Sequence, residues 1–138
     1  MIGATNRPDE LDEAARRRFV KRIYVPLPDN DGRRQLLQKL LADQVHSLRQ
    51  EDVDMLVEST SGYSGADMRA LCTEAAMGPC RELFDRGGLG SIQAADMPPI
   101  SLTHFKVALE TVAPSVSAAD LQKYVEWNSV FGTYRKME

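Results

Sequence analysis

The sequence predicts a mostly α-helical protein in which one or two strand segments precede the helices. Three observations lead to this fold class. Apolar residues recur at helical spacing from residue 30 towards the C-terminus. Capping residues, prolines and glycines divide that region into five or six helices. A single run, residues 20–27, is rich in β-branched and aromatic side chains, which is typical of a strand.

The first 28 residues contain little that could be stable alone. Residues 1–4 are small and apolar, like the last residues of a strand, and Pro8 then favours a turn. A short helix is expected over residues 12–18. A strand at residues 20–27 needs a partner for its backbone groups, and the sequence offers none. We therefore expect this strand to pair with residues outside the chain.

The helices that follow have recognisable ends. Ser64 and Asp67 resemble a capping box in which Asp replaces the usual Glu. Residues 85–99 are rich in glycine and proline and are expected to form a loop. The expected helices begin after Asp29 or Asn30, near Gln50, after Ser64, at Pro79, after Ser101 and after Ser117, and the last one ends at Gly132.

Composition excludes several classes of protein. The 138 residues are 43% hydrophobic and 27% charged, which is ordinary for a soluble globular domain. A net charge of −3 argues against a nucleic-acid partner held by bulk charge, and no apolar run is long enough to span a membrane. His46 and His104 stand alone, so no metal site is expected. Cys72 and Cys80 are expected to be free thiols, which favours a reducing compartment, the cytoplasm or the nucleus.

The candidate chemistry lies in the first eighteen residues. Asn6 follows the strand-like start, and Arg16, Arg17 and Arg18 follow about ten residues later. In phosphoryl transfer, an amide at a strand end can orient the attacking water, and an arginine from a neighbour can neutralise the transferring phosphoryl group. The spacing alone also fits a turn asparagine and a solvated basic edge, so both alternatives stay open at this point.

The sequences of three separate segments resemble motifs of one protein family. Residues 3–12, GATNRPDELD, followed by the RRF of residues 17–19, closely resemble the second region of homology of AAA ATPases. Residues 62–68, GYSGADM, resemble the lid motif of the same family. Residues 114–132 resemble the terminal helix of its meiotic clade, which includes katanin, spastin, fidgetin and the vacuolar-sorting ATPase. Residues 78–83 also resemble that clade. Within the clade, the sequence is most similar to fidgetin-like proteins.

This resemblance implies roles for individual residues. Asn6 matches sensor 1, which helps to place the lytic water. Arg17 and Arg18 match the pair of arginine fingers that act in trans on the ATP of the next subunit. Gly65 and Ala66 match the nucleotide-binding lid residues beside the adenine and ribose, although ordinary helix capping also explains them. Arg16 is one arginine more than the pair requires.

The resemblance also implies a domain organisation. Residues 1–28 would end the large α/β subdomain, residues 29–112 would form the helical lid subdomain, and residues 113–138 would form the C-terminal helix. The phosphate-binding loop G-x-x-x-x-G-K-[ST] and the acidic strand that holds metal do not occur in this sequence. The family would place both before Met1, which leaves open whether Met1 is a native start or a point of truncation.

The function implied is that of a part of an ATPase. The complete protein would use ATP and Mg²⁺ in a homo-oligomeric, hexameric ring that remodels a protein assembly. Microtubule severing, with tubulin as the substrate, is one such activity. The 138-residue chain alone is expected neither to hydrolyse ATP nor to bind it tightly. The alternatives are a non-catalytic helical interaction module that docks on AAA subunits and an unrelated helical adaptor.

Overall fold

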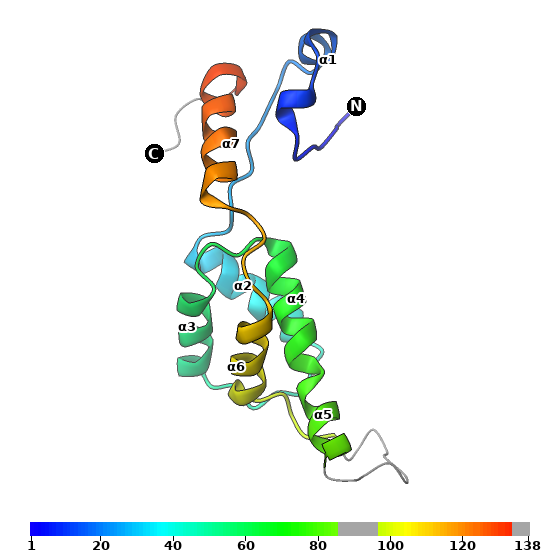
Figure 1. Ribbon diagram of the computed structural model, residues 1–138, viewed down its shortest axis with the longest axis vertical. Coiled ribbons are helices and arrows are strands. Elements are labelled where there is room, and N and C mark those ends of the chain that lie inside the picture. Colours follow the sequence, from blue (N-terminus) through cyan, green and yellow to red (C-terminus); the bar gives the residue numbers. More distant parts are fainter. Residues whose placement is uncertain (86–96, 134–138) are drawn as a thin grey trace. The chain divides into compact units, whose positions relative to one another are not determined.

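The computed structural model describes residues 1–85 and 97–133 of the chain. Within these ranges it contains seven α-helices and one 3₁₀ turn, which confirms the mostly helical class (Figure 1). The chain divides into two compact units. Unit 1 combines Met1–Pro26 with Val116–Glu138, and unit 2 is Leu27–Ser115.

Unit 2 is a bundle of five helices centred on α4. Helix α4 packs against both α2 and α6, and α3 packs against α2. Helix α5 continues almost directly from α4. The helices of unit 2 are α2 (Asn30–Leu41), α3 (Gln50–Ser59), α4 (Gly65–Ala76), α5 (Gly78–Asp85) and α6 (Leu102–Thr111).

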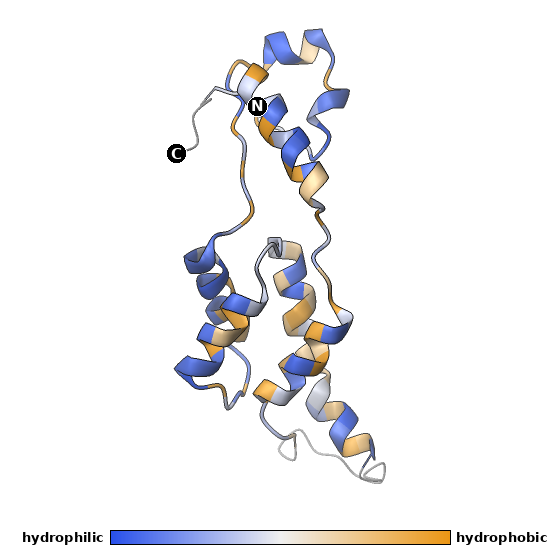
Figure 2. Cartoon of the chain, turned by 60° about the vertical axis from the view of Figure 1, so that its left-hand side comes forward, coloured by the Kyte–Doolittle hydropathy of each residue, from blue (hydrophilic) through white to orange (hydrophobic). Residues whose placement is uncertain are grey.

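The core of unit 2 comes from the apolar positions that recur along these helices (Figure 2). Phe105, Leu37, Met68 and Leu71 are completely buried. Cys72 is buried beside them, and burial raises the pKa of its thiol to about 11, whereas Cys80 is exposed. Both thiols are free, as expected. The core consists of Leu37, Leu41, Val53, Leu56, Val57, Tyr63, Met68, Leu71, Cys72, Ala75, Ile100, Phe105 and Ala108.

Side-chain caps fix where these helices begin. Asp29 accepts a hydrogen bond from the backbone N–H of Gly32 at the start of α2, 2.7 Å long. Ser64 and Asp67 form the expected reciprocal capping box at the start of α4. Such caps satisfy backbone donors that have no partner inside the helix. The expected starts of α2, α3, α4, α5, α6 and α7 agree with the structure within a residue or two.

Arg33 is the one buried arginine of the described core, and the hydrophobic pattern gave no indication of it. Only 4% of its surface is exposed. Its guanidinium donates to the carbonyl oxygens of Pro28 and Val57, over 2.9 and 3.0 Å, and to the side-chain oxygen of Asn30. A buried charge is tolerated where hydrogen bonds replace water. Arg33 therefore joins the start of α2 to the end of α3.

Unit 1 brings together the two ends of the chain. It contains a 3₁₀ turn η1 (Pro8–Glu10), α1 (Glu13–Arg18) and α7 (Ala118–Phe131). Helix α7 packs against η1, and its Tyr124 ring lies 6.4 Å from that of Tyr24. The apolar spacing of α7 predicts that Leu121, Tyr124, Val125 and Trp127 face inward. Leu121, Tyr124 and Trp127 are half-buried, whereas Val125 is 48% exposed.

The expected strand at residues 20–27 does not form, and neither does the strand end at residues 1–4. The side chains of Val20, Ile23 and Val25 are largely exposed, at 75%, 67% and 82%. A strand requires a neighbouring strand for its ladder of hydrogen bonds. In the described part of the chain, the backbone of this segment instead pairs with Thr133, and the only β-bridge joins His46 to Ile100.

Three further expectations concern the loop at residues 85–99, a membrane span and a metal site. Most of the expected loop at residues 85–99 lies outside the described residues. Among the described helices, none has the length and apolar character that crossing a bilayer requires. The described residues also hold no cluster of three or more potential metal ligands.

Truncation of the central aromatic side chain tests the core of unit 2. Phe105→Ala is expected to lower the free energy of unfolding by about 3–5 kcal/mol, because it removes a fully buried ring and leaves a cavity. Val107→Ala on the same helix is the matched control. Val107 is 49% exposed, so we expect a change within about 0.5 kcal/mol. Urea unfolding followed by far-ultraviolet circular dichroism measures both, and equal losses in the two variants would contradict this core.

Candidate functional sites in α1 and at the start of α4

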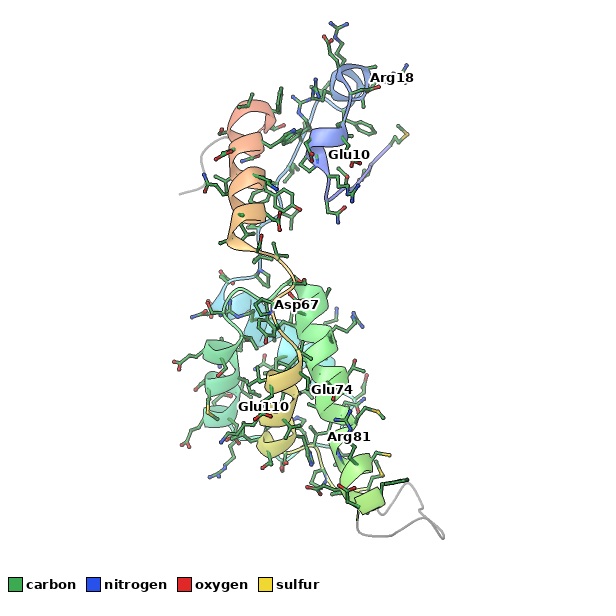
Figure 3. The ribbon with its side chains drawn as sticks, in the orientation of Figure 1. Glu10, Arg18, Asp67, Glu74, Arg81 and Glu110 are labelled. Atoms are coloured by element: carbon green, nitrogen blue, oxygen red, sulfur yellow. The ribbon has the colours of Figure 1, made fainter. Side chains whose placement is uncertain are left out.

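The three consecutive arginines at the end of α1 have different surroundings. The guanidinium of Arg16 donates to the carbonyl of Leu11 and lies 5.0 Å over the ring of Phe131. Arg17 forms an ion pair with Glu13 one turn earlier, and 78% of its side chain is exposed. Arg18, also exposed, is labelled at the end of α1 in Figure 3. Exposed pairs at this spacing contribute only about 0.3–0.5 kcal/mol, so Arg17 can exchange Glu13 for another anion at little cost.

Asn6 belongs to the same unit as these arginines, just before η1. Its backbone carbonyl accepts a 3.0 Å hydrogen bond from the hydroxyl of Tyr124 on α7. The residue itself is exposed. Asn6, Arg17 and Arg18 of the expected site therefore all belong to unit 1, where Tyr124 of α7 binds the backbone of Asn6.

Gly65 and Ala66 form the first turn of α4, in unit 2, and both are exposed. A methyl group added at Gly65 would meet no atom within 4 Å, so packing inside this chain does not require glycine there. Gly62, three residues earlier, has a φ of +81°, which a side chain would strain. The free N–H groups of a helix start favour negatively charged or polar ligands.

Asp67 and Tyr63 tie this turn to the segment that follows α6. A carboxylate oxygen of Asp67, labelled in Figure 3, accepts hydrogen bonds from the backbone N–H groups of Ser64 and Ser115, over 2.8 and 3.2 Å. The hydroxyl of Tyr63 donates to the carbonyl of Val112. The residues around Gly65 and Ala66 are therefore bonded directly to the segment that leads out of unit 2.

Burial and hydrogen bonds together shift the pKa values of Asp67 and Tyr63. Burial tends to raise the pKa of Asp67, but the hydrogen bonds from Ser64 and Ser115 outweigh it and hold that pKa below its usual range. Burial raises the pKa of the Tyr63 hydroxyl, and the charge of Asp67 raises it further. Asp67 is thus ionised and Tyr63 is neutral at neutral pH, which suits their roles as acceptor and donor.

Arg81 and His104 lie on either side of a small hollow of about 180 Å³ between α5 and α6. Arg81 pairs with Glu74 at 2.7 Å, and this hydrogen bond raises the pKa of Arg81 (Figure 3). The Nδ1 atom of His104 accepts the backbone N–H of Ser101, so His104 takes part in the cap of α6. Both residues have structural partners within unit 2.

The structure also identifies functional candidates that the pattern of the sequence did not. No motif in the sequence assigns a role to Arg22, yet its guanidinium donates hydrogen bonds to three backbone carbonyls. Asp67 was expected only as a cap, and its bond to Ser115 spans 48 residues. Contacts between residues so distant in sequence leave no periodic pattern, so spacing could not have revealed them.

Two family models match overlapping segments of the chain, which together span residues 50–132. Residues 50–94 match the AAA+ lid domain, and residues 92–132 match the Vps4 C terminal oligomerisation domain. The chain is 52% identical over 135 residues to the ATPase-like fidgetin of Schizosaccharomyces pombe, covering 98% of this chain and 20% of that protein. It is 44% identical over 132 residues to fidgetin-like protein 1 of Homo sapiens, covering 96% of this chain and 19% of that protein. The chain thus spans about a fifth of the length of these relatives.

Solved structures agree with these similarities. The FIGL-1 AAA domain in complex with ADP superposes with a TM-score of 0.88 and 45% identity, over 96% of this chain and 44% of that one. A katanin structure that concerns self-assembly superposes with a TM-score of 0.75 and 38% identity, over 87% of this chain and 43% of that one.

Removal of the Asp67 charge tests the tie between the start of α4 and Ser115. Because folding lowers the pKa of Asp67, its contribution to stability is complete above the unfolded value, about 3.9. That contribution is lost as the pH falls through the lower folded value. Asp67→Asn is therefore expected to unfold at a lower urea concentration at pH 7 and to lose less further stability than the unsubstituted chain below pH 4.

The control is Asp43→Asn, which neutralises an exposed carboxylate. It is expected to leave the urea midpoint at pH 7 unchanged. If Asp67→Asn had the midpoint and the acid dependence of the unsubstituted chain, the hydrogen bonds to Ser64 and Ser115 would contribute nothing to folding.

Proposed function

Because the chain belongs to the AAA ATPases that include the fidgetin-like proteins and katanin, we propose that it is the C-terminal part of an ATP-hydrolysing module that remodels a protein assembly. The observation that carries the proposal is the exposure of Arg17 and Arg18 at the end of a helix whose third arginine, Arg16, is tied inward. Two exposed guanidinium groups, of which Arg17 holds only a surface ion pair with Glu13, suit the neutralisation of a phosphoryl group held by another subunit.

The domain organisation that we propose follows the same family. Residues 1–28 end the large subdomain, residues 29–112 form the lid subdomain and residues 113–138 form the C-terminal helix. The match of residues 92–132 to an oligomerisation domain supports assembly of the complete protein into a homo-oligomeric ring. The relationship to a self-assembling katanin supports it too.

Each candidate residue has one role in this proposal. The Asn6 amide orients the attacking water from the end of the large subdomain. Arg17 and Arg18 reach the ATP of the neighbouring subunit, where their charge stabilises the transferring phosphoryl group. Gly65 and Ala66 lie beside the adenine and ribose, where a small side chain allows close approach to the helix start.

The residues of this chain fit only part of a site for ATP and Mg²⁺. The open space at Gly65 suits one wall of a nucleotide site. No glycine in the sequence is followed by lysine, so the chain has no phosphate-binding loop of the G-x-x-x-x-G-K-[ST] type. We propose that residues preceding this chain hold the triphosphate and Mg²⁺, and that the 138-residue chain alone is inactive. Its two free thiols suit the cytoplasm or the nucleus.

The substrate that we propose is a protein polymer of the tubulin type. The support is the resemblance to the clade that includes katanin and spastin, for which microtubule severing is the implied activity. The net charge of −3 gives no reason to propose nucleic acid instead.

A chimaera tests the finger assignment, with this chain following the large-subdomain part of the FIGL-1 AAA domain. Arg17→Ala and Arg18→Ala are each expected to lower kcat by about 10³-fold or more, because an arginine finger contributes about 10³–10⁵ in rate. The KM for ATP is expected to stay near that of the unsubstituted chimaera. Lys21→Ala removes a nearby exposed cation and is expected to leave kcat unchanged.

Mixed rings test whether the fingers act in trans. Chimaeras lacking both arginines are mixed with subunits whose phosphate-loop lysine has been replaced, and turnover is expected to recover because each defect is in a different subunit. Full activity of the double arginine variant would refute the finger assignment. An unsubstituted chimaera that hydrolyses no ATP but still joins FIGL-1 rings would favour the non-catalytic docking module.

A further inference from the structure

Among the described residues of unit 1, Arg22 is the cation with the most hydrogen bonds, although it lies outside the helices. Its Nη1 atom donates to the carbonyl oxygens of Arg16 and Phe19, over 2.7 and 2.8 Å. Its Nε atom donates to the carbonyl oxygen of Phe131 over 2.6 Å. Arg16 and Phe19 end α1, and Phe131 ends α7. One guanidinium thus binds the C-terminal ends of both helices.

Electrostatics favour this arrangement. The last carbonyls of a helix have no partner inside it and carry the negative end of the helix dipole. A cation there supplies both hydrogen bonds and opposite charge. The planar fork of an arginine can serve several carbonyls at fixed angles, whereas the compact ammonium of a lysine cannot hold the same geometry.

The backbone of Arg22 is fixed as well. Its N–H donates to the Thr133 hydroxyl over 2.8 Å, and its carbonyl accepts the Thr133 N–H over 2.9 Å. Nearby, the Arg16 guanidinium lies over the Phe131 ring, which contacts Trp127 at a centroid distance of 5.3 Å. The end of α1 therefore contacts the end of α7 through Arg22, Arg16 and the Phe131 ring.

We propose that Arg22 is a positioning residue for Arg17 and Arg18, which it sets in place by tying the end of α1 to the end of α7. Arg16 is a second tie and not a third finger. A six-residue helix is marginal without such support. The position of the fingers is therefore set by the end of the C-terminal helix, and damage there lowers turnover even where rings still assemble. This inference rests on the proposed function for its kinetic consequence only.

Hydrogen exchange on the 138-residue chain tests the tie itself. Arg22→Met keeps an unbranched apolar stem and removes the guanidinium donors, so the amides of Arg16 and Phe19 are expected to exchange at least tenfold faster. The amides of α4 and α6, in the other unit, are expected to keep their rates. Lys21→Met is the matched control and is expected to leave α1 unchanged. Unchanged exchange in Arg22→Met would overturn the tie.

A milder variant guards against loss of the whole unit. Thr133→Val keeps the shape of the side chain and removes the oxygen that accepts the Arg22 N–H. It is expected to speed exchange at Phe19 by a smaller factor than Arg22→Met. If Thr133→Val left the exchange rate at Phe19 unchanged, the Thr133 hydroxyl would have no part in the tie.

Kinetics in the chimaera test the positioning role. Arg22→Met is expected to lower kcat by about 10²-fold, the effect of misplacing a catalytic group by about 1 Å. The KM for ATP and the mass of the oligomer are expected to stay the same, because loss of assembly would move both. Arg22→Lys is expected to lower kcat too, because a lysine ammonium keeps the charge but cannot hydrogen-bond all three carbonyls as the planar guanidinium does. An unsubstituted kcat in Arg22→Met would overturn the proposal.

The two proposals fail in distinguishable ways. If alanine at Arg17 and Arg18 left kcat unchanged, the finger assignment would fail, while the exchange data would still decide whether Arg22 ties the helices. If that double variant were inactive but Arg22→Met kept both kcat and exchange at their original values, the positioning role alone would fail.

Discussion

The fold of unit 2 depends on the burial of α4 between its neighbours. Met68, Leu71 and Ala75 on this helix are completely buried, against α2 and α6. Burial of apolar side chains is the dominant favourable term in folding, so the position of α4 is the best determined in the unit. The start of the same helix carries Gly65 and Ala66, and Asp67 bonds it to Ser115. A rigid core helix thus positions the candidate nucleotide contacts.

Unit 1 depends on hydrogen bonds and ring contacts more than on a core. Its described residues contain just one buried side chain with a polar group, Asn128, and its aromatic side chains are half-buried or, in Phe131, exposed. The exposed Val20, Ile23 and Val25 belong to a segment that has no strand to pair with in this chain. Arg22 and Tyr124 link the N-terminal residues to α7 instead. The position of α1 therefore depends on the polar contacts between the N-terminal residues and α7.

Local patterns in the sequence predicted the helices well, because capping and apolar spacing act over three or four residues. Asp29, Ser64 and Ser117 each cap the helix that the pattern assigned to them. The strand at residues 20–27 was wrong for the described chain, because β-branched composition indicates a strand but cannot supply its partner. The roles of Arg22 and Asp67 were missed since their partners lie about 110 and 48 residues away. The motifs predicted roles for Asn6, Arg17 and Arg18 and left Arg16 outside the pair, and the structure adds that Arg16 binds the Leu11 carbonyl and lies over the Phe131 ring.

Calorimetric titration of Mg-ATP into the 138-residue chain tests most directly whether these residues supply parts of a nucleotide site without forming one. Gly65 and Ala66 are exposed and form one wall of the proposed site, and the sequence contains no phosphate-binding loop. We expect no heat of binding at millimolar nucleotide, with or without Mg²⁺. Binding with a micromolar Kd would contradict this account, because it would require a complete nucleotide site within these residues.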